Sequence, residues 1–134
     1  MLSDYPIAPT LPASDMARAR HFYQDVLGFH PVEVIVETGE VVYRSGGVSF
    51  FVYPSSSAGT NQGTAAAWRV PDLRAAVDAL EAKGVVFEEY HFAEIDTVDS
   101  IALMPDGTKV AWFKDSEGNI LAIDQLSQQA SSPV

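Results

Sequence analysis

The chain repeats one order of predicted elements, and this duplication constrains the fold more than any other feature. Each half reads strand, helix, strand, strand, strand. An aspartate precedes each predicted helix, Asp15 in the first half and Asp72 in the second, where its carboxylate can accept a hydrogen bond from a free amide of the first turn. A glycine closes each helix, at Gly28 and Gly84, because glycine tolerates the left-handed conformation that ends many helices. A duplication with a period near half of the chain predicts two similar modules in tandem.

Hydrophobic periodicity gives the elements of the first module, residues 5–53. Its first strand, residues 5–11, contains prolines, which place it at a sheet edge or in an irregular pairing because proline cannot donate to the ladder. A helix between Asp15 and Gly28 follows. The segment Ser45-Gly46-Gly47 predicts a tight hairpin loop between the last two of the remaining strands. These strands are expected over residues 32–37, 41–44 and 48–53.

A polar connector, residues 54–63, leads to the second module, residues 64–126. Together the modules are expected to make one domain, residues 1–126, followed by a flexible tail, residues 127–134. The loop over residues 92–107 is unusually apolar, so we suggest that it folds over a cavity or forms a subunit contact. A helix is expected between Asp72 and Gly84, with strands over residues 64–70, 85–91, 108–114 and 119–126.

Composition excludes several classes of function. The chain has 18 acidic against 8 basic residues and a net charge of -10. Such a surface repels phosphate backbones and anionic membranes, so we expect no nucleic-acid or membrane partner, and the acidity by itself indicates only solubility. The absence of cysteine removes disulfides and thiolate sites. No segment has the pattern of a membrane span or a signal peptide, which makes a cytoplasmic protein the expectation.

Three motifs carry a family resemblance. The segment PASDMARARHFYQDVLGF, residues 12–29, and the segment AWFKDSEGNILAIDQ, residues 111–125, resemble the first helix and the closing hairpin of the vicinal oxygen chelate superfamily. This group is also called the glyoxalase/bleomycin resistance protein/dioxygenase superfamily. The segment WRVPDLRAAVDALEAKGV, residues 68–85, fits the same pattern. The resemblance implies an α+β fold in which two tandem βαβββ modules form a curled mixed sheet around a cavity.

The resemblance also implies where metal-dependent members keep their ligands, and this chain departs from it there. The four positions hold Ala8, Phe50, Ala65 and Ala122. A divalent ion needs several oxygen or nitrogen donors within about 2.0–2.6 Å, and methyl groups and a phenyl ring offer none. We therefore expect no metal and no other cofactor.

The three histidines do not replace the missing ligands. His21 lies on the first predicted helix, His30 follows it, and His91 ends a predicted strand of the second module. They do not have ligand spacing, and only His91 is expected near the cavity. Three surface or partly buried histidines are the more economical interpretation.

The predicted cavity wall is largely apolar, as small-molecule sites usually are. Asp124 is the candidate polar anchor, because alternation along its strand places it on the face of Ala122. It either lies buried, with a raised pKa, or pairs with solvent or with Arg69. Trp68 is expected to pack in the core, whereas Trp112 fits wall or core equally. The predicted ligand-binding residues are Ala8, Phe50, Ala65, His91, Trp112, Ala122 and Asp124.

These expectations favour a metal-independent binding protein that sequesters a small apolar or cationic molecule, such as an antibiotic or a toxic metabolite. One alternative is a metal-dependent enzyme of the glyoxalase or dioxygenase kind, a lyase or an oxidoreductase. Another is a metal-free enzyme that uses Asp124 or His91 as its acid-base group. The resemblance further implies a homodimer, and sheet edges in so small a protein need covering.

Overall fold

The computed structural model describes residues 1–127 and divides into two compact units. The first unit comprises residues Met1–Asn61 together with the short segment Ser116–Asn119, and the second comprises Gln62–Asp115 and the chain from Ile120 onward. The boundary between Asn61 and Gln62 falls inside the predicted connector. The predicted tail lies outside the described residues, apart from Ser127.

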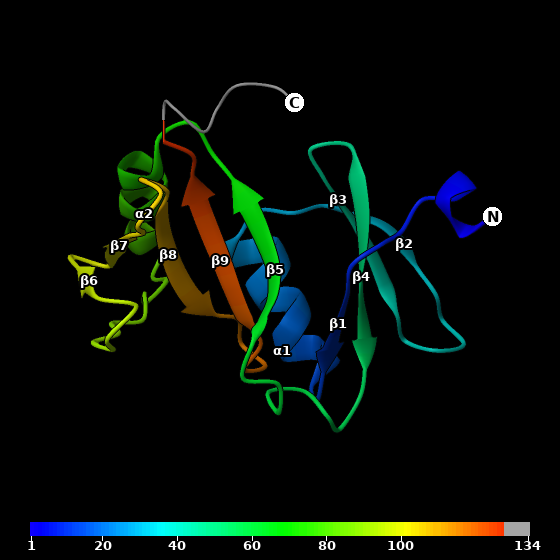
Figure 1. Ribbon diagram of the computed structural model, residues 1–134. Coiled ribbons are helices and arrows are strands. Elements are labelled where there is room, and N and C mark those ends of the chain that lie inside the picture. The colour runs from blue at the N-terminus through cyan, green and yellow to red at the C-terminus, as the bar shows by residue number, and fades with distance from the viewer. Residues whose placement is uncertain (128–134) are drawn as a thin grey trace. The chain divides into compact units, whose positions relative to one another are not determined.

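The first unit is built on a four-stranded mixed sheet with the order β1-β4-β3-β2 (Figure 1). Strand β1 runs parallel to β4, and the other neighbouring pairs are antiparallel. The expected hairpin forms, with Gly46 and Gly47 as its loop at φ of 56° and 84°. Ser45, predicted in the loop, is the last residue of β3 and pairs with Val48. The elements are the 3-10 turn Leu2–Asp4, β1 (Thr10–Ala13), α1 (Met16–Arg20), a π-helical continuation (His21–Val26), β2 (Pro31–Val34), β3 (Val41–Ser45) and β4 (Val48–Pro54).

The second unit repeats this plan with a five-stranded mixed sheet in the order β5-β9-β8-β7-β6. Strand β5 runs parallel to β9, and the remaining neighbours are antiparallel. The predicted α+β class with two tandem strand-helix-strand modules is therefore confirmed. The elements are β5 (Thr64–Arg69), α2 (Leu73–Ala82), β6 (Thr97–Val98), β7 (Ile101–Leu103), β8 (Lys109–Lys114) and β9 (Ile120–Gln125).

Both helices begin where the aspartates predict. The Asp15 carboxylate accepts a hydrogen bond from the amide of Arg18 at 3.0 Å, and Asp72 accepts one from Ala75 at 3.0 Å. Each cap satisfies an amide that the helix itself leaves without a partner. The first helix changes to π-helical geometry after Arg20, which a periodicity argument does not anticipate.

The first strand differs from its prediction. The segment around residues 5–11 was expected to pair, but β1 starts only at Thr10. The backbone pairing begins at Pro9, whose carbonyl accepts from the Phe51 amide at 3.0 Å. Pro6 and Pro9 cannot donate to a ladder, so the chain before Thr10 lacks the alternating donors that a strand needs.

A second difference lies between the second helix and β8. Residues 85–91 were predicted to be a strand, but they make only isolated bridges, from Phe87 to Phe113 and from His91 to Asp96. The predicted loop over residues 92–107 contains β6 and β7, and β7 pairs with β8 at Lys109 and Val110. Further along β8, Phe87 bridges to Phe113, and the Glu88 amide donates to the Trp112 carbonyl at 2.8 Å. Alternating apolar and polar residues over 85–91 indicate that one side of the segment is buried. They do not decide whether it forms a continuous ladder, because strand pairing depends on contacts elsewhere in the fold.

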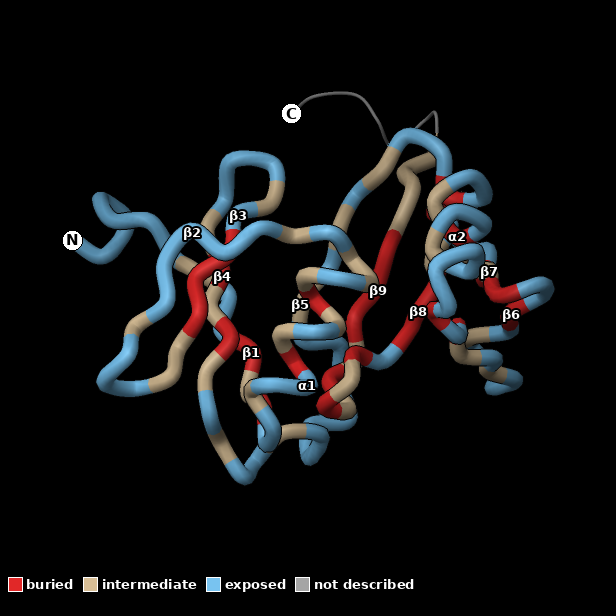
Figure 2. The backbone as a smooth tube through the Cα atoms, turned by 180° about the vertical axis from the view of Figure 1, so that it is seen from behind, coloured by how far each residue is buried: buried red, intermediate tan, exposed pale blue. Residues whose placement is uncertain are grey.

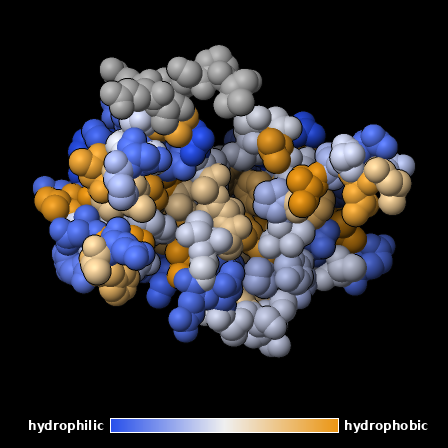
Figure 3. Space-filling view, viewed as in Figure 1, coloured by the Kyte–Doolittle hydropathy of each residue, from blue (hydrophilic) through white to orange (hydrophobic). Residues whose placement is uncertain are grey.

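Each unit has an apolar interior, and Figure 2 shows buried residues along β3, β4, β8 and β9. In the second unit, half-buried Trp68 stacks on the buried ring of Phe113 with ring centroids 6.2 Å apart, so it packs at the edge of the core. On the face shown in Figure 3, hydrophobic residues are interspersed with hydrophilic ones. Within residues 1–127, no helix is long and apolar enough to cross a membrane.

A close approach between two backbones yields a prediction for the connector. A Cβ atom added to Gly59 would lie 2.8 Å from the Glu117 carbonyl oxygen, and Gly59 has a φ of 77°. Gly59→Ala is therefore expected to lower the free energy of unfolding by about 2 kcal/mol, from backbone strain and steric overlap together. Gly47→Ala is the control, since φ there is 84° but nothing lies within 4 Å, and it should cost about 1 kcal/mol. Equal losses in urea denaturation would show that the contact with Glu117 has no energetic weight.

Candidate functional site

The sheet face that carries Ala122 in the second unit is closely packed. Trp112 on β8 lies directly opposite Ala122 on β9, and with Ala102 on β7 the two form a buried cluster, 9%, 4% and 1% exposed respectively. We call these three residues the Trp112 cluster. Partly buried hydrophobic residues pack around it: Tyr90, Ile95, Met104, Val110 and Ile120.

The cover over this cluster comes from the segment between α2 and β7. Tyr90 meets Trp112 edge to face, with ring centroids 5.4 Å apart, and stacks on Phe92 at 5.6 Å. Burial raises the pKa of the Tyr90 hydroxyl, so this ring stays neutral at ordinary pH. Phe92 is 63% exposed, so the row of ring contacts from Trp112 through Tyr90 ends at the protein surface. The packing of Ile95 and Met104 on the cluster explains why the predicted loop is so apolar.

Asp124 lies two residues beyond Ala122 on the same strand face and is paired. Arg69 on the neighbouring β5 donates to both of its carboxylate oxygens, at 2.9 and 3.1 Å. The Asp124 side chain is 19% exposed and that of Arg69 is 58% exposed. Of the two environments considered from the sequence, the pairing with Arg69 is the observed one. A carboxylate held in this fork is poorly available as a general base.

His91 lies in an exposed ion pair. Its Nδ1 atom is 2.8 Å from Oδ1 of Asp96, and both side chains are more than two-thirds exposed. An exposed histidine with one carboxylate partner does not make an acid-base site by itself. The surroundings of His91 therefore do not support the role of an acid-base group.

The remaining predicted site residues have different surroundings. Ala65 is exposed, at the point where the register of β5 on β9 shifts, so Ala67 is the residue opposite Ala122. In the first unit, Ala8 precedes β1 and is half-buried. Phe50 was expected on an open wall but packs in the aromatic core of that unit, 6% exposed, beside rings from Tyr23, Phe29 and Tyr43.

These placements bring some of the predicted residues together. Trp112 and Ala122 are in contact, and Asp124 shares their sheet face. Sequence reasoning missed Tyr90 as part of the cover, because a predicted strand over residues 85–91 assigns Tyr90 no partner. The apolar composition of the loop was the signal for Ile95.

Sequence reasoning also missed a buried acid in the first unit. Glu117, in the turn between β8 and β9, has no exposed side-chain surface. Arg18 donates to both of its carboxylate oxygens, at 2.8 and 3.1 Å, and the Asp15 amide donates at 2.9 Å. Burial by itself would raise the pKa of Glu117, but the hydrogen bonds from Arg18, the Asp15 amide and Ser116 outweigh it and lower the pKa to about 2.

This lowered pKa predicts an acid-dependent stability. The folded-state pKa lies below the ordinary value of 4.5, so the stabilisation is complete above about pH 5 and is lost as the pH falls towards 2. It amounts to no more than about 3 kcal/mol. Glu117→Gln should flatten the dependence of unfolding free energy on pH between about 5 and 2. A variant with the unaltered acid slope in urea titrations would show that other carboxylates are responsible.

The arrangement around Ala122 does not fit a metal ion. Residues 1–127 contain no group of three or more His, Asp or Glu side chains placed to hold one. Ala122 itself presents a methyl group beneath Trp112, and the Asp124 carboxylate two residues along is engaged by Arg69. A divalent ion would find no set of free donors on this face.

The family follows from a match over most of the chain. Residues 7–123 match the model of the glyoxalase/bleomycin resistance protein/dioxygenase superfamily. The chain belongs to this superfamily. No curated protein matches the chain closely enough to name a nearer relative.

Solved structures share the fold at low sequence identity. A bleomycin-binding protein complexed with bleomycin superposes with a TM-score of 0.68 and 19% identity, covering 92% of this chain and 99% of the other. An antibiotic binding protein from a Streptomyces strain has a TM-score of 0.62 and 19% identity, covering 92% and 98%. A lactoylglutathione lyase from Agrobacterium tumefaciens has a TM-score of 0.63 and 18% identity, covering 90% and 92%. Both binding proteins and an enzyme thus have this fold, which does not by itself decide between them.

Proposed function

We propose that this protein is a metal-independent small-molecule binding protein that sequesters an antibiotic or a toxic metabolite. The observation that carries the proposal is the Trp112 cluster, where Ala122 occupies the position of an acid in metal-binding relatives and lies under aromatic and aliphatic side chains. An apolar face with few polar groups is typical of small-molecule sites. Two of the proteins with this fold bind bleomycin or another antibiotic.

The ligand would lie against the exposed ring of Phe92 and the half-buried ring of Tyr90, which contacts Trp112. Aromatic faces favour flat apolar groups and positive charges placed over the ring. A net charge of -10 raises the local concentration of cations and disfavours anions. We therefore propose a cationic ligand with an aromatic or apolar body.

A homodimer in the cytoplasm is part of the same proposal. Strand β2 is the edge of the first sheet, and all its residues are exposed, with Val32 and Val34 at 52% and 41%. Edge strands with exposed valines are commonly covered by a partner. Sedimentation equilibrium gives the molecular mass in solution and tests this part separately.

The test of binding uses the two tryptophans as a matched pair. Trp112 lies in the proposed site, whereas Trp68 stacks on Phe113. Bleomycin and other cationic antibiotics are titrated, in the presence of chelator, into the variants Trp68→Phe and Trp112→Phe. We expect a saturable change of emission in Trp68→Phe, which retains Trp112, and little change in Trp112→Phe. Changes of equal size in both variants, or binding abolished by chelator, would contradict the proposal.

A further inference from the structure

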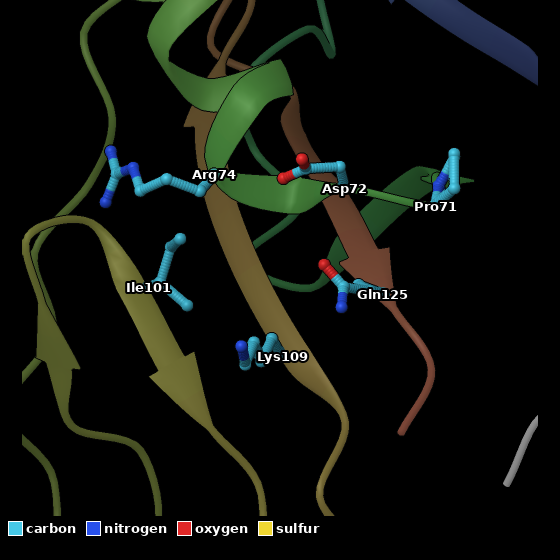
Figure 4. Close-up of a pocket in the computed structure, with 6 residues that line it drawn as sticks. All are labelled: Pro71, Asp72, Arg74, Ile101, Lys109 and Gln125. Atoms are coloured by element: carbon cyan, nitrogen blue, oxygen red, sulfur yellow. The ribbon is translucent and has the colours of Figure 1, made fainter. Parts of the chain in front are cut away.

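The second unit has a pocket away from the Trp112 cluster. It has a volume of about 560 Å³ and is lined by Pro71, Asp72, Arg74, Ile101, Lys109 and Gln125 (Figure 4). Lys109 at the start of β8 is paired in register with Gln125 at the end of β9. Gln125 is an odd number of residues from Ala122, so alternation places it on the opposite face of the sheet. We call this the Lys109 pocket.

The hydrogen bond between the Gln125 side chain and the helix determines which side-chain atom can still bind a ligand. Its Oε1 atom accepts from the Leu73 amide at 2.8 Å. This bond orients the side-chain amide, because only the oxygen can accept. Figure 4 accordingly shows the Gln125 oxygen towards the helix and its nitrogen on the other side. The NH2 group remains as a donor to the pocket.

The charges of the pocket are those of Lys109 and Asp72. Within residues 1–127, the Lys109 ammonium makes no hydrogen bond or ion pair. Asp72 uses one carboxylate oxygen, Oδ1, to cap the Ala75 amide, which leaves Oδ2 as an acceptor. The Arg74 guanidinium is engaged by Asp78 and by the carbonyl of Asp99, so Arg74 contributes mainly its aliphatic stem.

The helix amides themselves do not create this site. The amides of Leu73 and Ala75 are already taken by Gln125 and Asp72. What the pocket offers is an ammonium group, an amide donor and a carboxylate, beside the apolar side chains of Pro71 and Ile101.

We propose that the Lys109 pocket binds a small zwitterion of the amino-acid type. The ligand carboxylate would accept from the Lys109 ammonium and the Gln125 amide, and the ligand ammonium would donate to Asp72. An apolar side chain would lie on Ile101. A protein with a net charge of -10 repels a simple anion, whereas a ligand with no net charge avoids that repulsion and still satisfies both charged groups.

This inference is independent of the proposed function, because the two sites lie on opposite faces of the sheet. It is tested with L-leucine as the probe, in nuclear magnetic resonance titrations of the uniformly ¹⁵N-labelled full chain. The readouts are the Leu73 backbone amide and the side-chain NH2 of Gln125. We expect saturable shifts of both signals with L-leucine.

Two analogues separate the two charges of the probe. Leucinamide lacks the carboxylate and N-acetyl-L-leucine lacks the ammonium, and each is expected to bind about tenfold more weakly than L-leucine. If N-acetyl-L-leucine bound as well as L-leucine, the pocket would be an anion site and the proposal would be wrong. Absence of any shift at about 20 mM L-leucine would also overturn it.

Variants assign the binding to the named groups. Lys109→Gln and Asp72→Asn should each weaken L-leucine binding about tenfold. Asn at position 72 keeps the oxygen that caps the helix, so folding is retained. Lys114→Gln is the matched control, an exposed lysine at the other end of β8 and outside the pocket lining, and should change binding less than about twofold. If Lys114→Gln weakened L-leucine binding as much as Lys109→Gln, the loss would come from the change in net charge and not from a contact in the pocket. That result would contradict the proposed site.

Discussion

Replacing Ala122 with glutamate is expected to lower the free energy of unfolding by about 3 kcal/mol or more and to create no metal site. Ala122 is 4% exposed and lies against Trp112 and Ala102. A longer, charged side chain would both overfill this space and bury a carboxylate without donors around it. The acid that the family resemblance implies at this position in metal-dependent members is therefore incompatible with the neighbours of Ala122 in this chain.

Urea denaturation with and without added Zn²⁺ or Ni²⁺ measures both parts of this prediction. Ala67→Glu is the matched control, because Ala67 is the register partner of Ala122 on β5 but is exposed. The control should change the unfolding free energy by less than about 0.5 kcal/mol. An Ala122→Glu protein as stable as its parent, or one stabilised by either ion, would show that the face is open and able to hold metal.

Removal of Glu117 is expected to have the second largest effect, a loss of about 3 kcal/mol on substitution by alanine. The fully buried carboxylate accepts from Arg18, from the Asp15 amide and from the Ser14 hydroxyl. Its removal leaves these donors without their acceptor at the start of the first helix. Arg18 is half exposed and can regain water, which keeps the loss near the lower end of the range for buried pairs.

Asp78→Ala provides the comparison for this second prediction. Asp78 also forms an ion pair with an arginine, Arg74, but its side chain is 63% exposed. Exposed pairs contribute little, so the loss there should be below about 0.5 kcal/mol. Similar losses for Glu117→Ala and Asp78→Ala would mean that burial of Glu117 adds nothing to the interaction.

Features set by neighbouring residues were predictable from the sequence. The caps at Asp15 and Asp72 and the hairpin at Gly46 and Gly47 depend on a few adjacent residues, and the structure confirms all three. The duplicated order of elements was visible for the same reason, since each module repeats its own local signals. The family resemblance rested on these local motifs and is confirmed by the match over residues 7–123.

Features set by distant contacts were not predictable. A one-residue offset along a strand exchanges the two faces, and Phe50 accordingly lies in the aromatic core of its unit and not on an open wall. The Glu117 carboxylate meets Arg18, which is 99 residues away in the sequence. No pattern in the turn itself distinguishes this buried acid from an exposed one. The pairing of β7 with β8, within a segment predicted to be a loop, has the same origin.

The measurement that bears most directly on metal independence is the metal content of the purified protein after dialysis, determined by elemental analysis alongside the protein concentration. With apolar side chains around Ala122 and Asp124 already held by Arg69, we predict far less than one Ni, Zn, Mn or Fe atom per chain. One tightly held ion per chain, or one per two chains, would contradict the account and favour the enzymatic alternative.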